Sequence, residues 1–283
     1  MASAISRRNV TEVNRETSRT GAQLATRDWI PEGPARAGIV IVHGAAEHSG
    51  RYEHVGSALA ARGYATYSYD HRGHGESSGP SMHVDTWQEY VDDLEDRFSA
   101  VAVVLKLPMV LYGHSLGGLI ALDYCLSTSE LMPDLLVLSG PVLEANVAGW
   151  KKMLAPVLAR IMPRALLPLD LEGEQLSRDP RVGEAYFNDP LVATKATARF
   201  GAETLKAQAR VAERLPMLTI PTLLLAGGSD TIIPPQSSLA LAEVAVVERR
   251  LYPNLRHEIH NEPEGPEVVS DIADWIDAQL EER

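Results

Sequence analysis

Residues 108–126 read PMVLYGHSLGGLIALDYCL. A short apolar run leads directly into Gly113, Ser115 and Gly117, spaced as Gly-x-Ser-x-Gly, and a segment of helical composition follows. The order strand, tight turn and helix is the setting in which this pattern holds a nucleophilic serine. Glycines on both sides leave room for a strained turn residue, and the first N–H groups of the new helix point to where charge develops during attack on a carbonyl. We therefore predict that Ser115 is a nucleophile.

The same spacing occurs a second time, at residues 75–79, where the sequence reads GESSG. Polar loop residues precede this match and Pro80 follows it directly, so no helix begins there. We interpret Ser77 as part of a polar loop and not as a second reactive serine.

Composition limits the kind of protein that carries Ser115. The chain has 283 residues and a mass of 30.8 kDa, enough for one large α/β domain with an insertion. Its net charge of −12 disfavours nucleic acid and anionic membranes as electrostatically held partners. No apolar run reaches the ~18 residues of a membrane span, and the N-terminal segment lacks the apolar core of a signal peptide. We expect a cytoplasmic protein whose single cysteine, Cys125, packs in the core.

Hydrophobic runs along the chain predict a sheet. Residues 21–31 alternate like a strand and lead into a Pro-Glu-Gly-Pro turn, which indicates a hairpin at the sheet edge. Further strands are indicated at residues 38–43, 64–69, 109–112, 135–138, 221–226 and 248–252. Helical patterns separate most of these runs, so we predict a mostly parallel central sheet flanked by helices.

Helices are indicated by apolar residues three and four positions apart. This spacing predicts a long amphipathic helix over residues 85–105, and further helices at residues 236–246 and 268–280. The first of them carries an acidic outer face, which we interpret as solvated charge. Its acidic residues are Asp92, Asp93, Glu95 and Asp96.

The alternation of strand and helix stops between residues 142 and about 200, where no convincing strand occurs. We predict an α/β core in two parts, residues 1–141 and 201–283, with a helical cap at 142–200 inserted after the sixth strand. Within the cap, residues 153–169 are apolar and split by prolines, which predicts short helices. Their apolar surface either packs on the core or stays exposed to meet an acyl chain or a lipid aggregate, and we favour the second interpretation.

A serine nucleophile needs a base, and the base needs an acid to orient it. In a parallel sheet these groups come from loops at the C-terminal ends of strands. Asp230 follows the strand at 221–226, and His257 follows the strand at 248–252. Asp230 is therefore the predicted acid, and the order serine, aspartate, histidine is that of the α/β-hydrolases. The residues alone leave His257 and His260 as alternatives for the base.

Attack on a carbonyl also requires two N–H donors for the developing oxyanion. The residue after the nucleophile, Leu116, supplies one of them. The other comes from the loop after the strand at 38–43, where Ala45 is the best-placed candidate.

Two other classes of protein compete with this interpretation. The histidine pairs His71/His74 and His257/His260 raise the possibility of a metal-dependent hydrolase, but neither pair has a third ligand at metal-binding spacing. We therefore expect no metal and no other cofactor. A non-catalytic binding protein on the same fold is disfavoured because all three positions of the triad are filled.

Five motifs in order make the chain resemble a known family. They are HGAAEHSGRY at 43–52, DHRGHGES at 70–77, GHSLGG at 113–118, AYFNDPL at 185–191 and YPNLRHEIHNEPE at 252–264. From about residue 20 onward the chain resembles the monoacylglycerol lipases, serine hydrolases of the α/β-hydrolase superfamily. The resemblance implies a cofactor-free enzyme that cleaves carboxylic esters, above all monoacylglycerols. A broad carboxylesterase for small alkyl or aryl esters is the alternative.

The resemblance also implies roles for individual residues. It gives His257 as the base, with Ala45 and Leu116 as the oxyanion donors. The positions that hold or approach the glycerol head group in the family are here Glu47, Arg51, Tyr186 and His260. Glu47 and Arg51 lie four positions apart, so a surface ion pair is the alternative for them. Ala46 stands where the family has glycine, which adds a methyl group beside the oxyanion hole.

Overall fold

A computed structural model describes residues 13–127, 131–144 and 149–282, without the side chains of residues 149–154. Residues 1–12, which contributed to the prediction of a cytoplasmic protein, lie outside the described residues. None of the helices in the described ranges combines the length and the apolar composition of a membrane span.

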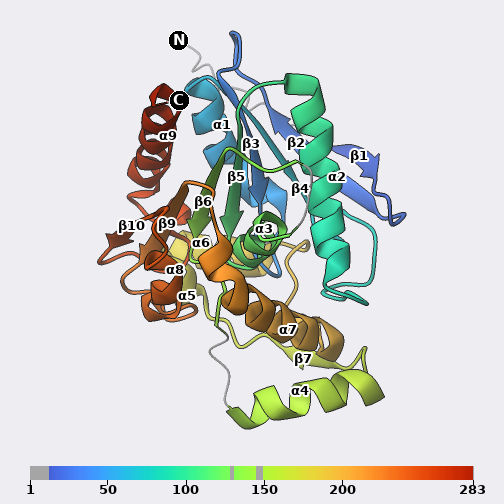
Figure 1. Ribbon diagram of the computed structural model, residues 1–283. Coiled ribbons are helices and arrows are strands. Elements are labelled where there is room, and N and C mark those ends of the chain that lie inside the picture. The colour runs from blue at the N-terminus through green and yellow to red at the C-terminus, as the bar shows by residue number, and fades with distance from the viewer. Residues whose placement is uncertain (1–12, 128–130, 145–148, 283) are drawn as a thin grey trace, which may run out of the picture.

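An eight-stranded sheet forms the centre of the molecule (Figure 1). Its strand order is β1-β2-β4-β3-β5-β6-β9-β10. The strands are β1 (Asn14–Thr17), β2 (Gln23–Trp29), β3 (Ala37–Val42), β4 (Tyr64–Tyr69), β5 (Met109–His114), β6 (Leu135–Ser139), β9 (Thr222–Gly227) and β10 (Val247–Tyr252). From β4 to β10 every neighbouring pair is parallel, whereas β2 is antiparallel to both of its neighbours. The predicted α/β class with a mostly parallel sheet is confirmed.

Helices cover both faces of this sheet because strand side chains alternate between two apolar clusters. Val40 and Val42 face one cluster, together with side chains of α2, α3 and α7. Ile39 and Ile41 face the other, beneath α1 and α9. The helices of the core are α1 (Glu53–Ala61), α2 (Gln88–Leu105), α3 (Leu116–Cys125), α8 (Leu239–Ala242) and α9 (Gly265–Glu281). Cys125 is buried in the first cluster, and α8 is shorter than the helix predicted at 236–246.

The edge hairpin is present, but its partner differs from the one expected. β2 pairs with β1, and the turn after residue 31 leads to β3, which β4 separates from β2 in the sheet. β1 reads NRET and is largely exposed, so no hydrophobic alternation marks it in the sequence. Its pairing rests on backbone hydrogen bonds to β2, which leave no trace in side-chain composition.

Residues 142–200 contain two short strands that the sequence did not indicate. β7 (Leu166–Pro168) and β8 (Lys195–Thr197) form an antiparallel pair. The helices are α4 (Gly149–Ile161), α5 (Gly173–Leu176) and α6 (Pro180–Asn188), and α7 (Ala198–Arg214) follows β8. Figure 1 shows α4, α7 and β7 gathered at one end of the sheet. α4 continues through Pro156, where a break was expected.

The second half of this segment is fastened to the loop that follows β3. The backbone N–H of Ala193 donates to the carbonyl oxygen of Ala46 at 2.9 Å. His48 Nε2 lies 2.9 Å from the carboxylate of Asp189. These two contacts hold residues 189–193 against the loop in which Ala45 lies.

The acidic face of α2 is not all solvated. Asp93 is fully buried, and each of its carboxylate oxygens accepts a hydrogen bond from Arg72 at 2.6 Å. Arg19 pairs with Asp96 at 2.5 Å and with Glu95 at 2.8 Å. The interpretation of Asp93 as solvated charge is therefore wrong, because its basic partner comes from a distant loop that helical periodicity does not reveal.

Candidate active site

Ser115 lies at the turn between β5 and α3, with φ of 51° and ψ of −114°. The flanking glycines are needed for close approach, since a Cβ at Gly117 would lie 2.0 Å from the carbonyl oxygen of Val42. A Cβ at Gly113 would lie 2.6 Å from the carbonyl oxygen of Gly117. A non-glycine residue at positive φ is strained, and strain of this kind gathers at functional sites.

A cavity of about 220 Å³ opens beside Ser115. Polar side chains in its wall are Glu47, His114, Ser115, Asp170, Tyr186, Thr204, His257 and Glu258. Apolar side chains in its wall include Leu116, Val142, Leu171, Leu176, Phe200 and Ile233. The cavity thus combines a few polar groups with a mainly apolar lining, as small-molecule sites usually do. Leu171, Leu176 and Tyr186 come from residues 142–200, so this segment contributes part of the wall.

His257 and Asp230 are in direct contact. His257 Nδ1 lies 2.7 Å from Asp230 Oδ2, and both side chains are buried. Asp230 Oδ1 accepts from the backbone N–H groups of Ile232 at 2.9 Å and Ile233 at 2.8 Å. Because the carboxylate accepts at Oδ2, Nδ1 of His257 carries the proton and Nε2 is left as the basic nitrogen.

Charges around His257 favour its protonated form. Burial of the imidazole lowers the pKa of His257, but the Asp230 carboxylate outweighs this effect, and Glu258 and Glu47 add to it, so the pKa is raised. His114 lies nearby, with its ring centre 4.8 Å from that of His257. Burial lowers the pKa of His114 well below its usual value, so His114 is a neutral neighbour.

In the loop after β3, the amide of Gly44 is already engaged. The Gly44 N–H donates to Glu47 Oε1 at 2.6 Å, and His43 Nδ1 lies 2.8 Å from the Gly44 carbonyl oxygen. The next N–H along the chain is that of Ala45, which lines the cavity. Leu116 also lines the cavity, and as the first residue of α3 its N–H has no acceptor within the helix.

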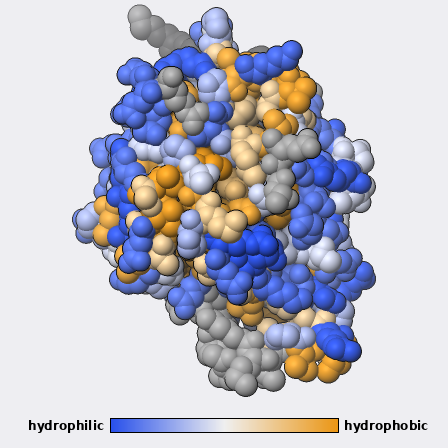
Figure 2. All heavy atoms as spheres, in the orientation of Figure 1, coloured by the Kyte–Doolittle hydropathy of each residue, from blue (hydrophilic) through white to orange (hydrophobic). Residues whose placement is uncertain are grey.

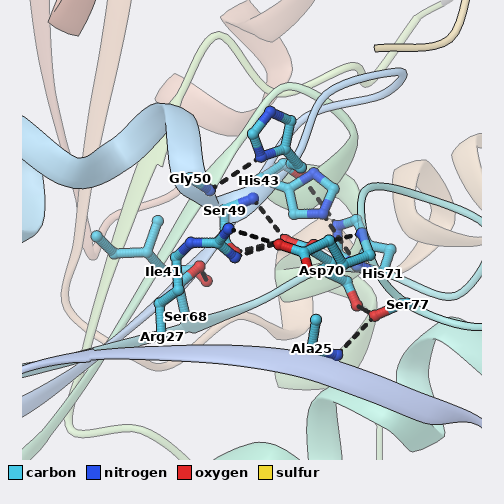
Figure 3. A network of polar contacts seen from close by, with 12 residues as sticks. Ala25, Arg27, Ile41, His43, Ser49, Gly50, Ser68, Asp70, His71 and Ser77 are labelled. Atoms are coloured by element: carbon cyan, nitrogen blue, oxygen red, sulfur yellow. Dashed lines mark hydrogen bonds and ion pairs between the residues drawn. The ribbon is translucent and has the colours of Figure 1, made fainter. Parts of the chain in front are cut away.

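A buried polar network holds this loop from behind (Figure 3). His71 donates its backbone N–H to His43 Nε2 at 2.9 Å, and His71 Nε2 lies 2.9 Å from the His43 carbonyl oxygen. Asp70 Oδ1 accepts from both the backbone N–H and the hydroxyl of Ser49, at 2.8 and 2.5 Å. These bonds fix the path of the chain on both sides of Gly44 and Ala45.

Arg51 lies between two buried carboxylates. Its Nη1 is 2.6 Å from Glu47 Oε2 and 2.6 Å from Glu258 Oε1, and its Nη2 is 2.7 Å from Glu258 Oε2. Burial raises the pKa of Glu47, and Arg51 offsets this only in part. Burial acts on Glu258 in the same way, but there Arg51 prevails and lowers the pKa to about 2. Glu258 is therefore ionised at neutral pH.

The residues assigned to the head group occupy different positions around this cluster. Glu47 and Tyr186 line the cavity, and the Tyr186 ring lies 4.8 Å from the Arg51 guanidinium carbon. Arg51 and His260 are not in the cavity wall. His260 is buried, stacks on Tyr52 at 4.9 Å between ring centres, and has a pKa that burial lowers to about 3.

Glu258 is a charged residue of the cavity wall that the sequence did not suggest as part of the site. It lies in the charged segment RHEIHNEPE, where nothing in the residue types separates a buried acid from a solvated one. Its contact with Arg51 joins residues 207 positions apart in the chain. The only local signal is its position directly after the predicted base.

Ala46 lies beside the oxyanion loop but outside the cavity wall. Its φ is 63°, and its side chain is buried. It lines a neighbouring hollow of about 250 Å³ together with Gly73 and His74. Ala46 is thus not among the residues that line the cavity beside Ser115.

The histidines of the pair His71/His74 pack against each other. His71 and His74 are buried with ring centres 5.6 Å apart, and burial lowers their pKa values to about 3 and about 4. Within residues 13–127, 131–144 and 149–282, no group of three or more His, Cys, Asp or Glu side chains is placed to hold a metal ion.

Comparisons with known proteins identify the family of the chain. The sequence profile of the family described as "Serine aminopeptidase, S33" matches residues 33–264. A monoacylglycerol lipase of Mycolicibacterium smegmatis is 34% identical over 271 residues, which cover 92% of this chain and 95% of that protein. The monoglyceride lipase of Homo sapiens is 33% identical over 274 residues, covering 93% of this chain and 88% of that protein.

Solved structures give the same result. The monoacylglycerol lipase of Paleococcus ferrophilus superimposes with a TM-score of 0.81 at 30% identity, over 90% of this chain and 99% of that chain. A soluble variant of the Saccharomyces cerevisiae monoglyceride lipase, in complex with a substrate analog, has a TM-score of 0.87 at 23% identity, over 96% and 97% of the two chains. The chain therefore belongs to the monoacylglycerol lipase family of α/β-hydrolases and is a carboxylic ester hydrolase.

Proposed function

We propose that this protein hydrolyses monoacylglycerols through an acyl-enzyme on Ser115, with His257 as the base and Asp230 as the orienting acid. The observation that carries the proposal is the 2.7 Å contact between His257 Nδ1 and Asp230, made in the wall of the cavity that also holds the strained Ser115. A neutral His257 with its proton on Nδ1 presents Nε2 to the serine hydroxyl, as general-base catalysis requires.

The reaction proceeds in two halves. Ser115 Oγ attacks the ester carbonyl while His257 takes its proton, and Asp230 stabilises the imidazolium that forms. The N–H groups of Ala45 and Leu116 donate to the oxyanion of the tetrahedral intermediate. His257 then protonates the leaving glycerol oxygen, and a water molecule activated by the same histidine releases the fatty acid from Ser115.

The choice of monoacylglycerol as substrate rests on the cavity and on the relatives. Apolar side chains such as Val142, Leu171 and Phe200 offer an environment for an acyl chain. Glu47 and Tyr186, near Arg51 and His260, form a polar region that could accept a small alcohol group. The named relatives from Mycolicibacterium smegmatis and Homo sapiens are lipases of this substrate class.

We further propose that residues 142–200 act as a cap that meets lipid aggregates. Several of the large apolar side chains in the C-terminal half of α4 and in the segment after it are more than half exposed: Val157, Ile161, Met162 and Leu166. Figure 2 shows hydrophobic spheres at the end of the molecule where Figure 1 draws α4. Exposed apolar residues on a segment that also lines the cavity are suited to receive a substrate from an apolar phase.

The test compares kcat/KM on a medium-chain monoacylglycerol with that on the methyl ester and the triacylglycerol of the same acid. We expect the monoacylglycerol to be preferred and Ser115→Ala to abolish turnover of all three. A fluorophosphonate should label the wild-type protein at Ser115 and leave Ser115→Ala unlabelled. Equal turnover of the methyl ester would contradict the substrate assignment and leave a general carboxylesterase, whereas undiminished activity of Ser115→Ala would contradict the mechanism.

A further inference from the structure

Two carboxylates in the cavity wall share one guanidinium, which lies outside the wall. Glu47 and Glu258 both line the cavity, whereas Arg51, which bonds to both, lies behind them. All three side chains are about nine-tenths buried or more. A ligand in the cavity therefore meets carboxylate oxygens, and the guanidinium acts as their counter-ion.

The hydrogen bonds of the two carboxylates leave one acceptor position on each. Glu47 Oε1 accepts from the Gly44 N–H and the Tyr52 hydroxyl, and Glu47 Oε2 accepts from Arg51. Glu258 Oε2 accepts from Arg51 and from Asn261 Nδ2, and Glu258 Oε1 accepts from Arg51. A carboxylate oxygen accepts about two hydrogen bonds. Among the described contacts, Glu47 Oε2 and Glu258 Oε1 each have one, and both lie 2.6 Å from the same nitrogen, Arg51 Nη1.

We propose that Glu258 is a specificity-determining residue of this enzyme, which pairs with Glu47 to accept hydrogen bonds from two hydroxyl groups of an uncharged alcohol. The proposal rests on the ester hydrolase function proposed above and names its head group. Tyr186 belongs to the same region, since its buried hydroxyl has no partner among the described residues. A glycerol leaving group supplies the two hydroxyl donors, whereas a methyl ester supplies none.

The charge of this cluster predicts which head groups are rejected. Glu47 and Glu258 place two acidic side chains against the one guanidinium of Arg51, in a site from which water is largely excluded. An anionic head group, such as the phosphate of an acylglycerol phosphate, meets two carboxylates at close range and loses its hydration. The structure therefore favours neutral polyol esters over anionic esters of the same acid.

The test varies one carboxylate and the head group together. Wild type, Glu258→Gln and Glu258→Asp are compared on a monoacylglycerol, the methyl ester and the acylglycerol phosphate of one fatty acid. In Glu258→Gln we expect the ratio of kcat/KM for monoacylglycerol over methyl ester to fall by about tenfold or more, because hydrogen bonds to a charged group are lost. The relative turnover of the acylglycerol phosphate should rise in the same variant. Glu258→Asp keeps the charge but withdraws the acceptor, so it should lose diol preference while still rejecting the phosphate.

A matched control separates recognition from structure. Glu262→Gln alters another buried carboxylate of the same loop, which pairs with Arg178 and does not line the cavity. It should leave the ratio between the two esters unchanged. Titration of Ser115 with a fluorophosphonate gives the concentration of folded sites in each variant, so a folding defect does not imitate a loss of selectivity.

The possible results discriminate between this inference and the proposed function. An equal fall of kcat/KM on both esters in Glu258→Gln would overturn the inference, since a residue that acts only through the His257 pKa or through packing affects every ester alike. A wild-type preference for monoacylglycerol that survives in Glu258→Gln would overturn the inference alone. A wild type without any preference for monoacylglycerol would overturn both.

Discussion

The two Gly-x-Ser-x-Gly segments share a spacing and differ in where they hold backbone strain. At residues 113–117 the serine itself takes φ of 51°, and the glycines provide close approach to neighbouring backbone. At residues 75–79 the positive φ values belong to the glycines, 51° at Gly75 and 114° at Gly79. The same pattern therefore describes a strained serine in one place and, in the other, a loop whose positive φ values are adopted by glycines.

The hydroxyl groups of the two serines differ in the same way. Ser77 Oγ donates to the Asp70 carbonyl oxygen at 2.6 Å and accepts from the Ala25 N–H at 2.8 Å (Figure 3). These hydrogen bonds join the loop to β2. Ser115 instead borders a cavity with His257 in its wall. The comparison teaches that a motif identifies a nucleophile only together with the elements on either side of it.

Replacing each serine by alanine should give the largest contrast. Ser115→Ala removes the attacking group and should lower kcat by about 10⁴-fold or more, as in other serine hydrolases. Ser77→Ala removes two hydrogen bonds that hold a loop, so it should lower the free energy of unfolding by about 1–2 kcal/mol. It should leave kcat within about twofold of the wild-type value. Steady-state kinetics and denaturant unfolding measure both. Loss of activity in a folded Ser77→Ala would erase the distinction drawn here.

Replacing one glycine in each segment should separate close approach from positive φ. Gly117→Ala places a Cβ 2.0 Å from the Val42 carbonyl oxygen and should lower the free energy of unfolding by about 3 kcal/mol or more. Gly79→Ala meets nothing nearer than 3.2 Å, so only its φ is unfavourable and the cost should be about 1–2 kcal/mol. Chemical denaturation measures both values. A Gly79→Ala variant that is the less stable of the two would contradict this order.

The pH dependence of serine labelling should depend on His257. The base is active when neutral, and its pKa is raised by Asp230 above the usual value, so the rate of fluorophosphonate labelling should fall as pH drops through a pKa above about 6.5. Below that pKa the rate should fall about tenfold per pH unit. Glu258→Gln removes a charge that favours the imidazolium, so the fall of the labelling rate should occur at lower pH. If the pH dependence of the labelling rate were the same in this variant, an electrostatic effect of Glu258 on the base would be excluded.

Relative to alanine, glycine should change the free energy of unfolding in opposite directions at the two serine positions. Relative to Ser115→Ala, Ser115→Gly should raise the free energy of unfolding by about 1 kcal/mol, because glycine accepts the positive φ. Relative to Ser77→Ala, Ser77→Gly should lower it by about 0.5–1 kcal/mol, because Ser77 has no positive φ and glycine only adds freedom to the unfolded chain. Thermal unfolding of the four variants measures this. Equal signs would mean that strain at Ser115 is not stored in its backbone.

Local patterns were enough to predict the centre of the molecule. β3, β5, β6 and β9 are fully buried runs, so their composition alone marks them, and α2 and α9 carry regular apolar stripes. The predicted Ser115 and Asp230 follow such strands, whereas His257 follows β10, a strand that is only partly buried. The chain order therefore placed them at one edge of the sheet before any contact between them was visible.

The features that the sequence missed all depend on contacts between distant residues. β7 and β8 are three residues each and form only because they meet one another. In the sequence Asp93 does not differ from the other acidic residues of its helix, and only its contact with Arg72 sets it apart. Glu258 and Arg51 are both charged and both buried because each neutralises the other, and no property of either residue alone predicts that.

The bond from Ala193 to Ala46 and the pairing of Asp189 with His48 have a consequence for recombining this enzyme with its relatives. Exchanging residues 142–200 as one block with those of a relative would replace Asp189 and Ala193. The loop after β3 would then lose the two contacts that these residues make. A crossover placed before α6 would keep these two anchors with their native loop and would transfer only α4, β7 and α5. The crossover point for exchanging this part of the cavity wall thus lies inside the segment and not at its ends.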